Sequence, residues 1–105
     1  MMVGFEEIIN HFGVNRQSRQ AMEECSELIQ AINKMLRYPD DEIKRLELIE
    51  EIADVLIMIT QLKIIFDIEQ SEIRRMMNYK KSRLVQRYKL DLLQKNDGTR
   101  SDRTE

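Results

Sequence analysis

The chain has 105 residues, of which 42% are hydrophobic and 34% are charged, and its net charge is −2. This balance excludes a disordered chain and a generally basic nucleic-acid binder, and the length favours a single domain. Three glycines and one proline are too few for the turns of a many-stranded β protein, and the single cysteine, Cys25, excludes an internal disulfide. The sequence has no basic-then-apolar leader and no apolar run of membrane-spanning length, so we expect a cytoplasmic protein.

The spacing of apolar residues predicts four helices, over residues 5–12, 16–37, 42–66 and 69–93. Gly13 ends the first helix, and Pro39 ends the second because proline disfavours helix at the residue before it. Asp40 or Asp41 caps the third helix, and Asp67 separates it from the fourth. The fold class is therefore all-α.

The third predicted helix changes character along its length. Residues 42–51 are amphipathic, whereas residues 52–66 are apolar on almost all sides. Such a helix is buried on most sides. In a chain this small, we expect it in the centre of a bundle or against another subunit.

The end of the chain differs in composition from the rest. Residues 94–105 contain almost no apolar side chains. We therefore predict a single all-α domain over residues 1–93, followed by a flexible polar C-terminal tail over residues 94–105.

Charges are separated along the chain. Residues 23–54 contain ten acidic and four basic side chains, whereas residues 73–90 contain seven basic side chains and no acidic one. The central helices are therefore acidic, and the late helix is basic.

Two carboxylate motifs stand out in the acidic part, Glu24-x-x-Glu27 and Glu51-x-x-Asp54. Residues three apart lie on one face of a helix, where two like charges repel each other unless a cation lies between them. A single such pair is common on solvated helices, but Asp54 lies within an apolar run, and a buried carboxylate is usually paired or bound to a metal. Two pairs on adjacent helices therefore favour a metal site.

The ligand types indicate which metal. Carboxylate oxygens suit Mg²⁺, with Mn²⁺ as a substitute, whereas zinc prefers histidine or cysteine. The only histidine, His11, lies in another predicted helix, and there is no Glu-x-x-His of the kind found in di-iron bundles.

The same residues resemble a known family. The two motifs, within the segments EECSELIQAINK and EEIADVLIM, are similar to those of MazG-like proteins in the all-α NTP pyrophosphatase superfamily. The resemblance covers roughly residues 5–87. It implies a four-helix bundle of antiparallel helices, with a core completed in a dimer or tetramer. It also implies a nucleoside triphosphate substrate, cleaved to the monophosphate and pyrophosphate.

The resemblance also implies roles for individual residues. Glu24, Glu27, Glu51 and Asp54 become the catalytic metal ligands, and Asn78 and Lys81 become the nearest match to an asparagine and a basic residue on the late helix. Ions held by the four carboxylates would lower the pKa of a water that attacks the α phosphorus. The choice of Glu23 or Glu27 as proton acceptor stays open, as do the base and the sugar.

Two further substrate contacts are predicted from position alone. Gln17 and Gln20 precede the first motif by one or two helical turns, so they are candidate contacts for the base or ribose.

Two other functions remain open at this point. A non-catalytic helical interaction module explains the apolar third helix equally well, but it does not explain Asp54. A nucleic-acid binder would use the basic late helix and would lose affinity steeply with salt, but the acidic middle of the chain disfavours it.

Overall fold

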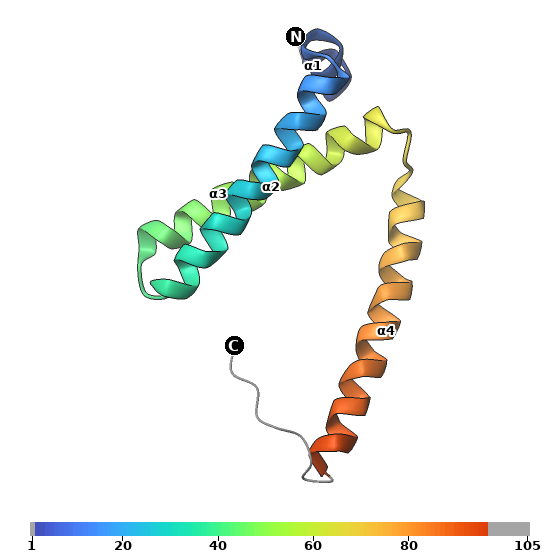
Figure 1. Cartoon of the computed structure of the whole chain (residues 1–105). Helices are drawn as coiled ribbons and strands as arrows, with labels where there is room; N and C mark the ends of the chain where they lie inside the picture. Colours follow the sequence, from blue (N-terminus) through green and yellow to red (C-terminus); the bar gives the residue numbers. More distant parts are fainter. Residues whose placement is uncertain (1, 97–105) are drawn as a thin grey trace. The chain divides into compact units, whose positions relative to one another are not determined.

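The computed structural model describes residues 2–96. Within that range it contains four α-helices and no strand, which confirms the all-α prediction (Figure 1). The helices are α1 (Phe5–Phe12), α2 (Val14–Arg37), α3 (Glu42–Ile65) and α4 (Gln70–Asn96). The chain divides into two compact units, of which the first ends at Ile68 and the second begins at Glu69.

The first unit is built on the pair of helices α2 and α3. The chain turns after α2, and α3 returns along it, while α1 contacts both helices at the other end (Figure 1). The buried apolar side chains of the described residues are Ile9, Ala21, Ala31 and Met58. The core of this unit is thus a narrow seam between the two long helices.

Gly13 joins α1 to α2. Its N–H donates to the Ile9 oxygen at 2.7 Å, and its own oxygen accepts from the Gln17 N–H at 3.1 Å, so one residue caps both helices. Its φ of 95° lies where a β carbon is strained, which makes glycine the suitable residue here. Because the cap is this tight, α2 begins at Val14, slightly earlier than the apolar spacing indicates.

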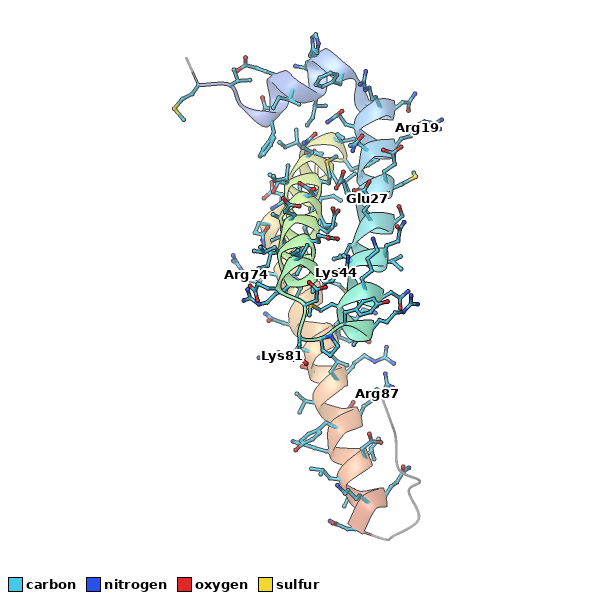
Figure 2. All side chains as sticks on the ribbon, turned by 90° about the vertical axis from the view of Figure 1, so that its left-hand side faces the viewer. Arg19, Glu27, Lys44, Arg74, Lys81 and Arg87 are labelled. Atoms are coloured by element: carbon cyan, nitrogen blue, oxygen red, sulfur yellow. The ribbon has the colours of Figure 1, made fainter. Side chains whose placement is uncertain are left out.

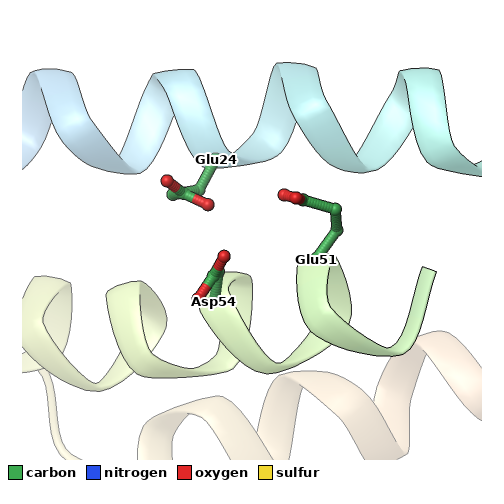
Figure 3. A group of neighbouring side chains, drawn as sticks. All are labelled: Glu24, Glu51 and Asp54. Carbon is green, nitrogen blue, oxygen red and sulfur yellow. The ribbon is translucent and has the colours of Figure 1, made fainter. Parts of the chain in front are cut away.

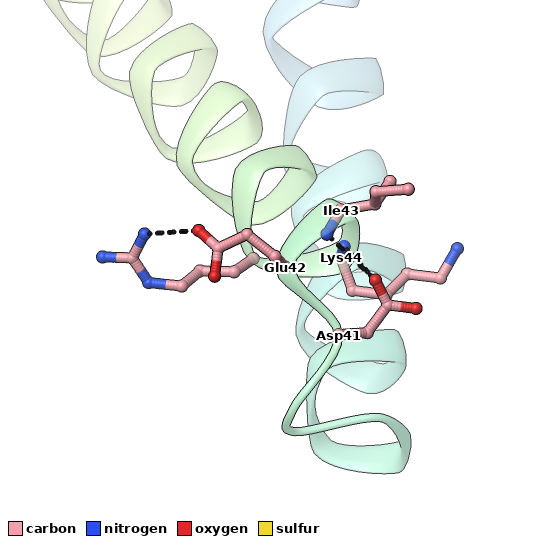
Figure 4. A network of polar contacts seen from close by, with 5 residues as sticks. Asp41, Glu42, Ile43 and Lys44 are labelled. Atoms are coloured by element: carbon pink, nitrogen blue, oxygen red, sulfur yellow. Dashed lines mark hydrogen bonds and ion pairs between the residues drawn. The ribbon is translucent and has the colours of Figure 1, made fainter.

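The turn between α2 and α3 is held by backbone and side-chain hydrogen bonds. The Tyr38 N–H donates to the Lys34 oxygen at 2.9 Å, and the Asp41 N–H donates to the Tyr38 oxygen at 3.1 Å. Of the two candidate caps, Asp41 is the one used: its Oδ1 accepts from the N–H groups of Ile43 at 2.9 Å and Lys44 at 3.2 Å (Figure 4).

The end of α3 is also well defined. The Ile68 N–H donates to the Lys63 oxygen at 2.9 Å, and the Asp67 N–H donates to the Ile64 oxygen at 3.4 Å. This pair of bonds is the Schellman arrangement, with Asp67 in the left-handed region at a φ of 53°. Aspartate tolerates that conformation better than most residues do, so Asp67 ends the helix as predicted.

Within one chain, α3 is less buried than expected for a helix in the centre of a bundle, and its burial against another subunit stays a prediction. Only its contacts with α2, and with α1 at one end, cover it, whereas Ile52, Leu56, Ile57 and Ile59 are exposed, Leu56 by 59%. Periodicity identifies apolar positions, but one neighbouring helix covers only part of a helix that is apolar all round. The apolar surface of α3 is therefore larger than the α2–α3 seam buries.

The second unit is the single helix α4. The Glu72 carboxylate accepts from the Glu69 N–H at 2.9 Å at its start, and no residue of the helix is buried. Its basic side chains, among them Arg74, Lys81 and Arg87, project along its length (Figure 2). The helix reaches Asn96, so residues 94–96 of the predicted tail are helical, and residues 97–105 lie outside the described range.

None of the four helices, within residues 2–96, combines the length and the apolar character needed to cross a bilayer.

The capping role of Asp41 generates a stability prediction. We expect Asp41→Ala to lower the free energy of unfolding by about 1 kcal/mol, because two N–H groups at the start of α3 lose their acceptor. Urea unfolding at one fixed protein concentration measures the change. Asp40→Ala is the matched control, since Asp40 makes neither bond, and an equal loss in both variants would contradict the assignment of the cap.

Candidate metal centre

Three of the predicted acidic ligands converge between the two long helices. Glu24 projects from α2 toward Glu51 and Asp54, which lie one turn apart on α3 (Figure 3). One carboxylate oxygen from each residue lies within 4.8 Å of the other two. All three side chains are half-buried. The structure thus brings Glu24 to two negative charges that lie 27 and 30 residues after it in the sequence.

The hydrogen bonds of this cluster are incomplete. Gln20, one turn before Glu24, donates from Nε2 to Glu24 Oε1 at 3.0 Å. The Oε2 atoms of Glu24 and Glu51 are buried and have no hydrogen-bond partner among the described residues. Buried polar atoms are normally partnered, so the two oxygens face a space where a cation or a proton is favourable.

The electrostatics point the same way. Burial raises the pKa of Glu24, the hydrogen bond from Gln20 opposes this, and the charges of Glu27 and Asp54 raise it further. Burial also raises the pKa of Glu51, to which the charge and hydrogen bond of Glu27 add. Both shifts mean that the cluster resists carrying its full negative charge alone.

The ligand set suits a particular kind of ion. Glu24, Glu51 and Asp54 offer only carboxylate oxygens, which are the ligands of hard cations such as Mg²⁺ and Mn²⁺. The unpartnered Oε2 atoms of Glu24 and Glu51 are buried acceptors of this type. These residues therefore fit a divalent cation of that class.

Glu27 lies at the edge of the cluster. It is exposed, and its charge raises the pKa of Glu51, but it is not one of the three converging residues. It lines a small groove of about 140 Å³ between α2 and α3, together with Gln30, Ala31, Lys34, Glu47, Glu50 and Glu51. The fourth predicted ligand is therefore next to the other three and more open to solvent.

Gln17 faces the interior of the helix pair. It is buried, and its Nε2 donates to Gln61 Oε1 on α3 at 2.8 Å. Gln61 was not singled out from the sequence, although its place seven residues after Asp54 is a signal that could have found it. The predicted contact of Gln17 with a base or ribose stays a prediction.

Asn78 and Lys81 lie on α4, in the second unit. They are exposed and one turn apart, so they share a face of that helix, and both line one surface hollow along it. Their predicted contact with substrate stays a prediction.

The raised pKa values generate a pH prediction. A carboxyl group whose pKa is raised on folding favours the folded state below its ordinary value of 4.5, and this contribution is lost as pH rises through the raised value. In EDTA, we therefore expect Glu24→Gln to melt at a higher temperature than the wild type at pH 7, and the difference to shrink toward pH 4.5. Mg²⁺ should stabilise the wild type more than the variant.

Thermal melts across this pH range measure both effects. Glu23→Gln is the matched control, because it removes an exposed charge that is not part of the cluster. A Glu24→Gln protein that melts no higher than the wild type at pH 7 in EDTA would contradict the claim that the charge of Glu24 destabilises the metal-free protein.

Comparison with known proteins identifies a family for the chain. No curated protein and no solved structure gives a significant match. The MazG nucleotide pyrophosphohydrolase domain matches residues 13–84, a segment that contains both carboxylate motifs and more than half of the chain. The chain is therefore a member of the MazG nucleotide pyrophosphohydrolase family.

Proposed function

We propose that this protein is a Mg²⁺-dependent nucleoside triphosphate pyrophosphohydrolase, which converts an NTP or dNTP to the monophosphate and pyrophosphate. The observation that carries the proposal is the convergence of Glu24, Glu51 and Asp54, with two buried carboxylate oxygens that have no partner in the described residues. Membership of the MazG family points to the same activity.

The residues of the chain have distinct parts in this proposal. Glu24, Glu51 and Asp54 hold the divalent cation, and Gln20 orients Glu24 through its hydrogen bond. Glu27, beside Glu51, completes the ligand set. The ion supplies neutralisation of the triphosphate and activation of water at neutral pH.

The late helix supplies positive charge in the same proposal. Lys81 and Asn78 share one face of α4, where an ammonium group and an amide are suited to phosphate oxygens. We assign them contacts with the phosphates of the substrate, in a protein that works in the cytoplasm.

Self-association is the other component of the proposal. Apolar side chains on the outside of α2 and α3 are exposed, among them Met22, Ile29, Leu56 and Ile57. Large contiguous apolar surfaces in soluble proteins mark interaction sites. We propose that further copies of the chain cover them in a dimer or tetramer, which completes the bundle core.

Turnover of the carboxylate variants tests the activity. We expect Glu51→Gln and Asp54→Asn each to lower pyrophosphate release by more than about 100-fold, because each removes a charged metal ligand. Circular dichroism should show the helical content unchanged. Glu6→Gln is the control, since Glu6 lies on α1, outside the family match.

The screen uses canonical and modified NTPs and dNTPs with Mg²⁺, and the wild type in EDTA should release no pyrophosphate. Wild-type rates in both ligand variants would refute the assignment of the site. No release from any nucleotide would instead favour a non-catalytic helical interaction module, which the exposed apolar surface of α3 also suits.

Sedimentation tests the self-association. We expect the wild type to sediment as a dimer or tetramer at micromolar concentration. Leu56→Glu places a charge in the exposed apolar surface of α3 and should shift the protein toward smaller species. A wild type that stays monomeric throughout would contradict the proposed completion of the core.

A further inference from the structure

A pair of glutamines lies between α2 and α3. In the described part of the chain, Gln17 and Gln61 are the only polar residues that are buried, with 7% and 4% of their surface exposed. Gln17 Nε2 donates to Gln61 Oε1 at 2.8 Å, and Gln61 Nε2 contacts the sulfur of Met58 at 3.9 Å. The first distance is typical of a good N–H···O bond, so the two helices are joined here by one directional contact.

The glutamine pair lies at the same sequence spacing from the carboxylate cluster on both helices. Gln17 lies seven residues before Glu24, and Gln61 lies seven residues after Asp54. Seven residues are about two helical turns, so each glutamine shares a helix face with its carboxylate. Because α3 returns along α2, both steps lead in the same direction along the seam. The glutamine layer therefore lies about two turns from the layer of Glu24 and Asp54.

The rest of the seam specifies alignment only weakly. Its other buried side chains are Ala21, Ala31 and Met58. Alanine is small and methionine adapts its shape to its surroundings, so such contacts tolerate sliding. A buried polar pair is different, because misalignment leaves the amides without a partner, and buried polar residues fix the register of paired helices elsewhere.

The cluster, in contrast, needs accurate alignment. Sliding one helix by a residue moves its side chains about 1.5 Å along the axis and turns them by about 100°. Glu24 would then leave its place opposite Glu51 and Asp54. Mg²⁺ requires nearly ideal octahedral geometry, so a site shared between two helices depends on their register.

We propose that the Gln17–Gln61 hydrogen bond fixes the register of α2 against α3 and thereby positions Glu24 opposite Asp54 and Glu51 as metal ligands. This inference rests on the proposed function, because it concerns the same cluster. The two glutamines are positioning residues, acting on the ligands through the helix pair.

The test replaces both amides by methionine in the full-length chain. Gln17→Met with Gln61→Met keeps the length of each side chain and removes the hydrogen bond. Mn²⁺ binding without nucleotide is measured by isothermal titration calorimetry, beside the melting temperature and helical content. Gln86→Met is the matched control, because Gln86 is exposed on α4 and outside the family match.

We expect the wild type and the control to bind Mn²⁺ alike and the double variant to bind it about 10- to 100-fold more weakly while it stays helical, which is the usual effect of losing a contact that orients metal ligands. The Mg²⁺ concentration for half-maximal turnover should rise in parallel. If the double variant fails to fold, Gln17→Met alone, in which Gln61 keeps its contact with Met58, is measured in the same way.

Each result bears on a different claim. A folded variant that binds Mn²⁺ as the wild type does, even at a lower melting temperature, would overturn the positioning role and leave the proposed function intact. A wild type that binds no Mn²⁺ would overturn the metal centre itself, and the positioning role with it.

Discussion

The repulsion among carboxylates held in the seam of a helix pair is the constraint on which the rest of the structure depends. Glu24, Glu51 and Asp54 are drawn together by the packing of α2 on α3, although burial and mutual repulsion raise the pKa of both glutamates. If the cluster had no function, apolar side chains at these positions would make the protein more stable. The position of the charges is therefore best understood as a requirement of their chemistry.

Much of the first unit could be predicted from sequence because its signals are local. Gly13, Pro39 and Asp67 each act on the backbone at or next to their own position, and a helix ends within two residues before each of them. The two carboxylate motifs could be paired because a short turn joins two helices of equal length, which brings the motifs to about the same level along the helix pair. These features depend on few contacts distant in sequence.

The remaining features depend on tertiary contacts, which periodicity does not contain. Cys25 belongs to the apolar stripe of α2 and would be expected in the core, yet it is exposed because α3 covers only part of that stripe. The hydrogen bond of Gln17 with Gln61 inside the seam could not be predicted from the position of Gln17, and its contact with a base or ribose stays a prediction. Either Asp40 or Asp41 could cap α3 by residue type, and only the geometry of the turn decides between them.

The tight turn between α2 and α3 has a consequence for how the protein folds. Only 23 residues separate Glu27 from Glu51, and nearly all of them are helical, so the two halves of the cluster meet without closing a long loop. Chains with such local contacts fold quickly, and this hairpin is expected to form early. In that case the carboxylates of the cluster already repel one another in the transition state for folding. Divalent cations should therefore accelerate folding as well as stabilise the folded structure.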